Sequence, residues 1–317
     1  MPELTDRLYS KKWGVFTHYL EHEQNVPGNF SCTVEAATSW NGCVNELDVG
    51  LIARQLKDAG AGYLFFTVMQ ITKYLCAPND TYNKITGYKP GEAASERDLI
   101  NDLYEALNPL GIDLYLYYTG DGPRLDPVAG PAFGFLGGAE KNASHAFVAK
   151  WASVLREYCV TYGDKVKGWW IDGCYKSPNK CTYDDDKLKI YKDAIRDGNK
   201  NAIVAFNDGI KERVSYYSAH DDFLAGEMHD FVDIPDSRFI NGKQWHILAP
   251  IGVPPDGNKH TAWCKPGVNR SGEYMRDYVR KVNEKGGVVT IDVCLKRDGS
   301  IPKEQIDVLK AINMTVT

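Results

Sequence analysis

The chain has 317 residues, 43% of them hydrophobic and 25% charged, which excludes a disordered chain, a collagen and a coiled coil. Its formal net charge is −5, so a nucleic-acid partner is not expected, because phosphates require a basic surface. No apolar run approaches the roughly 20 residues of a membrane span, so no membrane partner is expected either. The first twelve residues are polar and lack an apolar signal core. That is typical of a cytoplasmic protein, or of a secreted or periplasmic one whose leader has been removed, and the compartment stays open.

Short β-rich runs alternate with longer helical ones along the chain. Residues 63–68 are continuously apolar, as in a strand buried on both faces. Leu47, Ile52 and Leu56 follow helical spacing, and Ser95 is typical of a helix cap. The predicted strands, in chain order, are 13–18, 63–68, 112–118, 166–171, 202–206, 222–227, 244–250 and 287–293. The predicted helices are 46–58, 95–108, 143–162, 184–196, 272–284 and 302–312.

Repeated strand–helix units that return to a strand favour one (β/α)₈ barrel of the TIM type. No linker, repeat or charge block divides the chain, so residues 1–317 are predicted to form a single catalytic domain. A doubly wound sheet is the alternative. It would carry a glycine-rich phosphate loop after the first strand, and residues 18–22 are nothing like one.

Two carboxylates stand at predicted strand ends, where a barrel of this type carries its chemistry. Asp172 follows an apolar wall of two Trp and an Ile, and Glu227 ends the sixth predicted strand. Cleavage of a glycosidic bond needs such a facing pair, one as nucleophile or base and the other as acid. A helix cap for Asp172 and a surface loop for Glu227 are the alternatives. Asp208 lies in an Asn-Asp-Gly turn, which is compatible with the rim of an active site.

The histidines do not favour a metal site. His18 and His22 are four apart but lack the intervening Glu of a zincin motif. No metal and no cofactor are therefore expected. A less favoured alternative is a metal-dependent barrel hydrolase that uses His220, Asp222 and His229 as ligands.

The eight cysteines contain no C-x-x-C pair, which argues against a structural zinc site. Cys174 and Cys181 are close enough in sequence to form a disulfide. Most of the cysteines are expected to be free thiols.

Four segments, in order along the chain, resemble the α-L-fucosidases of glycoside hydrolase family 29. Residues 13–19, Trp-Gly-Val-Phe-Thr-His-Tyr, resemble the family's opening strand, and residues 59–63, Ala-Gly-Ala-Gly-Tyr, its second strand. Residues 168–173, Gly-Trp-Trp-Ile-Asp-Gly, are similar to its nucleophile motif. Residues 285–302 look like its closing strand and the Asp-Gly-x-Ile-Pro segment that follows. The resemblance covers the catalytic barrel only, and we expect no C-terminal β-sandwich.

The resemblance implies roles for individual residues. Asp172 becomes the nucleophile of a retaining mechanism, and His18 a contact to a sugar hydroxyl. Asn207-Asp208 resembles the family's Asn-Asp-Arg at the fifth strand. Glu227 resembles the Glu of its Thr-Pro-Glu segment, where an acid/base is found.

The departures from the family pattern concern the residues that hold the sugar. The family's His pair after the second strand is replaced by Gln70 and Ile71, and only Gln70 can hydrogen-bond a hydroxyl. A Trp-Glu pair appears here as Trp245-His246, and Asp292 stands where Asn is usual. These changes are expected to weaken the recognition of fucose.

The sequence therefore predicts a retaining exo-glycoside hydrolase of the α-L-fucosidase type with a carbohydrate substrate. Asp172 and Glu227 are its predicted catalytic residues. The predicted substrate-binding residues are His18, Gln70, Trp170, Asn207, Asp208, Trp245 and His246. Two alternatives stay open: a non-catalytic carbohydrate-binding barrel, and a glycosidase for a sugar other than fucose. The sequence does not indicate an oligomeric state.

Overall fold

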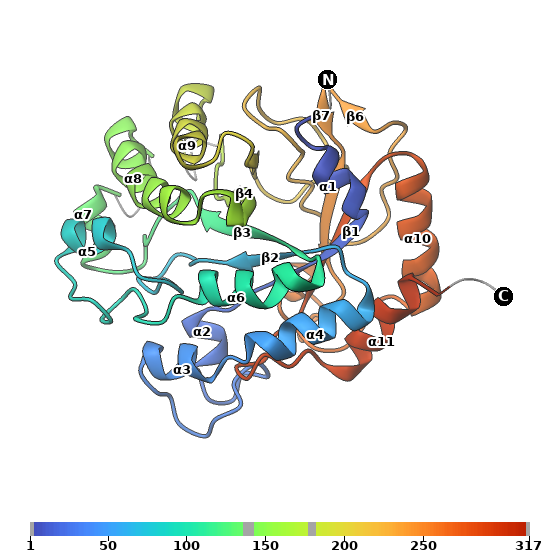
Figure 1. The fold of residues 1–317 in the computed structure, drawn as a ribbon, viewed down its shortest axis with the longest axis horizontal. Coiled ribbons are helices and arrows are strands. Elements are labelled where there is room, and N and C mark those ends of the chain that lie inside the picture. Colours follow the sequence, from blue (N-terminus) through green and yellow to red (C-terminus); the bar gives the residue numbers. More distant parts are fainter. Residues whose placement is uncertain (1–2, 136–142, 177–181, 315–317) are drawn as a thin grey trace.

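The structure, a computed structural model, describes residues 3–135, 143–176 and 182–314 (Figure 1). Its centre is a parallel sheet made of β1 (Trp13–Thr17), β2 (Tyr63–Thr67), β3 (Asp113–Thr119), β4 (Val166–Asp172), β5 (Ile203–Phe206), β8 (His246–Pro250) and β9 (Val288–Val293). The strand order is β5-β4-β3-β2-β1-β9-β8, and every neighbouring pair is parallel. A separate antiparallel hairpin joins β6 (Phe239–Ile240) and β7 (Lys243–Gln244).

The sequence prediction of six long helices agrees with the structure to within a few residues at each end. These helices are α4 (Val49–Ala59), α6 (Leu99–Leu107), α8 (His145–Tyr162), α9 (Asp185–Gly198), α10 (Gly272–Glu284) and α11 (Lys303–Ile312). The start of α6 differs from the prediction, because Asp98 rather than Ser95 caps it by accepting the Asn101 N–H at 2.9 Å. The described chain also has short helices α1 (Asp6–Lys11), α2 (Glu21–Gln24), α3 (Trp40–Glu46), α5 (Asp80–Thr86) and α7 (Ala129–Phe133). None of the described helices combines the length and the apolar character that a membrane crossing requires.

The predicted closed barrel of eight strands is corrected by the structure to a curled, half-barrel sheet of seven strands. The predicted sixth strand, 222–227, is irregular and spans the space between the edge strands β5 and β8. It makes two isolated parallel bridges to the β7–β8 region, Phe223 to Gln244 and Glu227 to Leu248. Gly226, with a φ of 62°, departs from extended geometry, and a Cβ there would lie 1.9 Å from the carbonyl oxygen of His246.

Side-chain carboxylates replace a regular ladder where this segment meets β5. The backbone N–H groups of Val204 and Phe206 donate to the carboxylates of Asp222, at 3.0 Å, and Asp221, at 2.8 Å. The backbone N–H of Asp222 donates to the carbonyl of Val204 at 2.7 Å. The backbone groups at the edge of β5 are thus satisfied without an extended partner strand.

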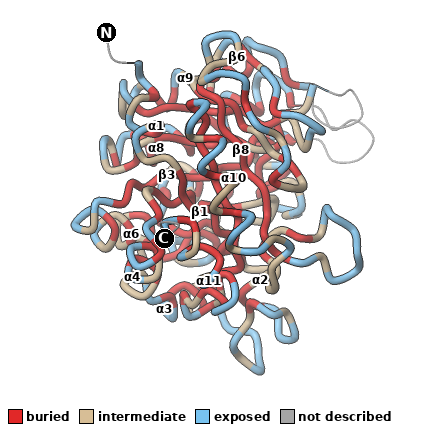
Figure 2. Tube along the Cα trace, turned by 90° about the vertical axis from the view of Figure 1, so that its right-hand side faces the viewer, coloured by how far each residue is buried: buried red, intermediate tan, exposed pale blue. Residues whose placement is uncertain are grey.

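β1, β3 and β8 are buried along their whole length (Figure 2). Hydrophobic side chains fill both faces of the sheet. The outer face packs against the long helices. The inner face is lined by aromatic rings, among them Phe16, Phe65 and Tyr115. These side chains fill the concave side of the half-barrel except at the carboxyl ends of the strands, where a cavity remains.

Candidate active site

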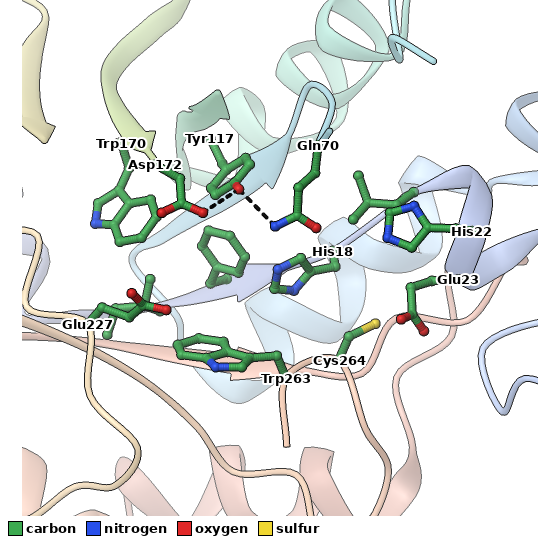
Figure 3. A pocket seen from close by; sticks show the side chains of 13 residues that line it. His18, His22, Glu23, Gln70, Tyr117, Trp170, Asp172, Glu227, Trp263 and Cys264 are labelled. Carbon is green, nitrogen blue, oxygen red and sulfur yellow. Dashed lines mark hydrogen bonds between the residues drawn. The ribbon is translucent and has the colours of Figure 1, made fainter. Parts of the chain in front are cut away.

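A cavity of about 160 Å³ lies at the carboxyl ends of the strands (Figure 3). It is lined by side chains that follow or end β1 to β4, namely His18, Gln70, Tyr117, Trp170 and Asp172, and by Glu227, Trp263, Cys264 and the α2 residues His22 and Glu23. A space of this size is comparable with a single sugar ring. The structure therefore brings Asp172, Glu227, His18, Gln70 and Trp170, all predicted from the sequence, to one cavity.

Asp172 is held by a chain of neutral hydrogen-bond donors. The hydroxyl of Tyr117 donates to its Oδ2 at 2.7 Å, and Gln70 Nε2 donates to the Tyr117 oxygen at 2.9 Å. Burial, together with the negative charge of Asp172, raises the pKa of Tyr117 well above its ordinary value. Tyr117 therefore remains a proton donor to Asp172.

Asn207 bridges the two predicted catalytic carboxylates. Its Nδ2 lies 2.8 Å from Asp172 Oδ1 and 2.7 Å from Glu227 Oε2, so these two oxygens are at most about 5.5 Å apart. The backbone N–H of Gly209 donates to Asn207 Oδ1 at 3.2 Å, which fixes the amide with its NH₂ group toward the carboxylates. Each of the two amide protons thus has its own acceptor.

Trp170 connects β4 to the segment that carries Glu227. Its indole stacks on the ring of Tyr117, with 5.6 Å between the centroids, and its Nε1 donates to the carbonyl of Ala225 at 3.1 Å. The backbone of Glu227 is itself tied to β8 by its bridge to Leu248. The irregular segment is consequently fixed on both sides of Glu227.

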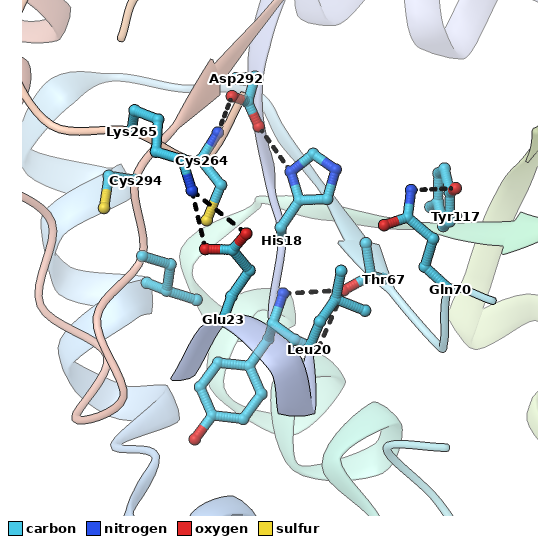
Figure 4. A network of polar contacts seen from close by, with 12 residues as sticks. His18, Leu20, Glu23, Thr67, Gln70, Tyr117, Cys264, Lys265, Asp292 and Cys294 are labelled. Carbon is cyan, nitrogen blue, oxygen red and sulfur yellow. Dashed lines mark hydrogen bonds and ion pairs between the residues drawn. The ribbon is translucent and has the colours of Figure 1, made fainter. Parts of the chain in front are cut away.

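Glu23 lines the other side of the cavity, and the buried Asp292 lies behind His18; each carboxylate contacts a basic side chain (Figure 4). His18 Nδ1 lies 3.0 Å from Asp292 Oδ1, and Lys265 Nζ donates to both oxygens of Glu23 at 3.2 and 3.0 Å. Trp263, which precedes Lys265 by two residues, packs its ring edge to face against His18.

Three predicted sugar contacts do not reach this cavity. His246 is fully buried inside the sheet, where its Nδ1 lies 2.9 Å from the carbonyl of Leu224 and its Nε2 2.6 Å from Thr290 Oγ1. Burial lowers its pKa to about 4, so it is a neutral part of the core. Trp245 is buried on the outer face, and the Asp208 carboxylate pairs with Lys211 at 2.8 Å. Alternation along the strand turns Trp245 and His246 to opposite faces, and His246, the first residue of β8, lies at the amino end of the sheet, away from the cavity.

The proposed metal ligands do not come together. Asp222 pairs with Lys192 and Arg196, and His229 packs against His260. Within the described parts of the chain, no group of three or more His, Cys, Asp or Glu side chains could hold a metal ion. The alternative of a metal-dependent hydrolase therefore has no structural support.

Six described cysteines, at positions 32, 43, 76, 159, 264 and 294, are free thiols. Cys181 lies outside the described residues, so its predicted pairing with Cys174 has no structural test.

Several residues of the cavity were not among the predicted site residues. Tyr117 stands near the end of a predicted strand, and that position could have identified it as a cavity residue. Glu23, Trp263 and Cys264 lie in a short helix and in an irregular loop, which carry no periodic pattern that points inward. Ile71, expected to replace a sugar contact, lies in a left-handed turn with a φ of 49° and does not line the cavity.

A family model described as α-L-fucosidase matches residues 44–315. The chain belongs to the α-L-fucosidase family of glycoside hydrolases. The sequence matches none of the curated proteins with significance. The resemblance that the sequence motifs predicted is therefore confirmed at the level of the family.

Solved structures of two α-L-fucosidases and of an endo-fucoidan hydrolase share the fold of this fucosidase-family chain. The α-L-fucosidase AlfC from Lactobacillus casei has 16% identity and a TM-score of 0.66, with 98% of this chain and 97% of that one covered. A family 29 α-L-fucosidase from Bacteroides thetaiotaomicron has 15% identity and a TM-score of 0.66, over 98% of this chain and 73% of that one. The endo-fucoidan hydrolase MfFcnA4 of glycoside hydrolase family 107 has 14% identity and a TM-score of 0.69, over 98% of this chain. The chain spans 54% of the length of MfFcnA4.

Proposed function

We propose that the protein is a retaining exo-glycosidase that removes a terminal hexose or 6-deoxyhexose, with Asp172 as nucleophile and Glu227 as acid/base. The bridge made by Asn207 carries this proposal. In retaining enzymes the two carboxyl groups lie about 5–5.5 Å apart, whereas inverting enzymes leave about 6.5–9.5 Å for a water molecule. The upper limit of about 5.5 Å between Asp172 Oδ1 and Glu227 Oε2 fits the first class.

The proposed reaction has two steps. In the first, Asp172 attacks the anomeric carbon, and Glu227 gives its proton to the leaving oxygen, so that a glycosyl-enzyme forms and the aglycone departs. In the second, Glu227 removes a proton from water, which attacks the same carbon and releases Asp172. The net configuration of the sugar is retained. Tyr117 and Asn207 hold the Asp172 carboxylate in place for the attack.

The size of the cavity supports exo action on one terminal sugar. Its volume of about 160 Å³ leaves room for little more than one ring between the catalytic carboxylates and Glu23. Trp170 and Trp263 supply aromatic surface for the ring, and His18 and Gln70 supply groups for its hydroxyls.

Product stereochemistry tests the proposal directly. A panel of aryl fucosides, galactosides and rhamnosides identifies a substrate, and ¹H NMR then follows the anomer that is released first. We expect the configuration of the substrate. Release of the opposite anomer would exclude Asp172 as a nucleophile, and a folded protein that binds sugars without turning over any panel member would support the non-catalytic alternative.

Glu227→Ala tests the acid/base role separately. An acid matters most for a poor leaving group, so this variant should lose far more activity on a natural glycoside than on an activated aryl glycoside. Azide should rescue the second step and yield a glycosyl azide with the configuration of the substrate. Glu212→Ala, a change at an exposed Glu on a neighbouring loop, is the matched control and should behave as wild type.

A further inference from the structure

The strongest polar arrangement outside the catalytic pair centres on Asp292, at the end of β9 (Figure 4). Its side chain is 1% exposed, and its two oxygens have different partners. Oδ1 lies 3.0 Å from His18 Nδ1, and Oδ2 accepts the backbone N–H of Cys264 at 2.8 Å. One buried carboxylate thus touches both the sugar-facing histidine and the loop that carries Trp263.

The contact between Asp292 and His18 determines which ring nitrogen carries the proton. Burial raises the pKa of Asp292, and its contacts with His18 and with the N–H of Cys264 oppose that shift. In its ionised form the carboxylate only accepts hydrogen bonds, so His18 Nδ1 must then carry the proton. Neutral His18 then has a bare Nε2, which points away from Asp292 toward the side of the cavity where Gln70 and Tyr117 lie (Figure 4). A bare nitrogen accepts a hydrogen bond and cannot donate one.

Because Asp292 also contacts Cys264, an Asn at position 292 would favour the opposite tautomer of His18. The N–H of Cys264 requires an acceptor, so an Asn would turn its oxygen toward Cys264 and its NH₂ toward His18. Nδ1 would then have to be bare, and Nε2 would carry the proton into the cavity. Cys264 has a left-handed φ of 60°, an uncommon conformation that persists where its surroundings hold it in place.

We propose that Asp292 is a positioning residue that determines specificity: it fixes neutral His18 as a hydrogen-bond acceptor, so that the site requires a free hydroxyl on the sugar at that point. A hydroxyl can donate to Nε2. A fluorine, an ether or a sulfate ester at the same carbon can only accept, and would face the lone pair of His18 without a proton between them. The hydroxyl requirement rests on the proposed function, whereas the tautomer of His18 does not.

Nitrogen NMR of the ligand-free protein tests the tautomer without any substrate. Protein labelled with ¹⁵N-histidine is titrated to rising pH until the His18 ring is neutral, and His18→Gln assigns the signals. We expect a protonated Nδ1 and a bare Nε2 in the wild type, and the reverse in Asp292→Asn. Asp113→Asn is the matched control, because Asp113 is a buried carboxylate with its own basic partner, Arg7, and should leave the His18 signals unchanged. A wild type with the proton on Nε2 would overturn the proposal even if Asp292→Asn failed to fold.

Kinetics with monodeoxyfluoro analogues of the best aryl glycoside test the consequence. At one ring position, the wild type should discriminate against fluorine roughly tenfold more strongly than Asp292→Asn, chiefly through KM. Equal discrimination at every position, with the expected NMR result, would remove the specificity role from Asp292 and leave only its effect on the tautomer. Absence of turnover with that same NMR result would count against the proposed function and not against the assignment of His18.

Discussion

The two sides of the cavity hold their carboxylates in opposite ways. On the catalytic side, neutral donors bind Asp172 and Glu227, through the hydroxyl of Tyr117 and the amide of Asn207. On the far side, the ammonium group of Lys265 pairs with Glu23, and the imidazole of His18 contacts Asp292. A neutral donor orients a carboxylate and leaves its negative charge in place. In the ion pair, the positive charge of Lys265 offsets the negative charge of Glu23. In the proposed mechanism, Asp172 is thus held in place without a cationic partner beside the oxocarbenium-like transition state.

Among variants of the catalytic side, Asp172→Asn should lose the most activity. The change keeps the shape of the side chain but removes the nucleophile, so kcat should fall by roughly 10⁴-fold or more. Circular dichroism should show an unchanged fold. Asp208→Asn is the control, because that carboxylate pairs with Lys211 outside the cavity and its loss should cost little activity. Near wild-type hydrolysis by pure, folded Asp172→Asn would contradict the role of Asp172.

Asn207→Ala removes the bridge on which the catalytic side depends. Two hydrogen bonds to carboxylates are lost, and kcat should fall by roughly 10²- to 10³-fold while the fold is preserved. The rates of wild type and variant on the same aryl glycoside measure the effect. A change of less than about fivefold would mean that the carboxylates keep their separation without the bridge.

Glu23→Gln probes the far side, where we expect an effect on binding and little on chemistry. The amide keeps the shape of Glu23 and loses its charge pairing with Lys265. KM should rise by about three- to tenfold, whereas kcat should stay within about twofold. Glu35→Gln, at an exposed position, serves as the reference. A fall in kcat that matches the rise in KM would place Glu23 with the catalytic residues.

Asp221 provides a smaller and purely energetic test, in the segment that supports Glu227. Burial raises its pKa to about 7 in the folded protein. Because this value lies above the ordinary one, near 4, its contribution to stability is complete below about pH 4 and is lost as the pH rises through 7. Urea unfolding should thus show a smaller loss of stability between pH 5 and pH 8 in Asp221→Asn than in the wild type. An identical loss in both proteins would mean that Asp221 does not titrate in this range.

Sequence patterns predicted the regular part of this molecule well because its signals are local. The apolar run at Tyr63–Thr67 and the helical spacing between Val49 and Ala59 describe elements whose burial each segment encodes by itself. The end of a buried strand is equally local, and it identified Asp172. The same strand-end argument pointed to Glu227, although its segment is irregular in the structure, and the family resemblance implied a role for His18.

The errors arose where a contact between distant segments decides the outcome. Residues 222–227 have the composition of a strand, yet the carboxylates of Asp221 and Asp222 occupy the N–H groups of β5 that a strand would use. His246 is the first residue of β8, and its side chain points into the packed interior rather than the cavity.

The sequence by itself determined the strand–helix alternation, the family and the nucleophile candidate, since each depends on short stretches of chain. Only the tertiary structure decided that Asn207 joins Asp172 to Glu227 and that Asp292 joins His18 to Cys264. Both connections link residues that are far apart in the chain, and hydrogen bonds depend on distance and direction, which no local pattern records.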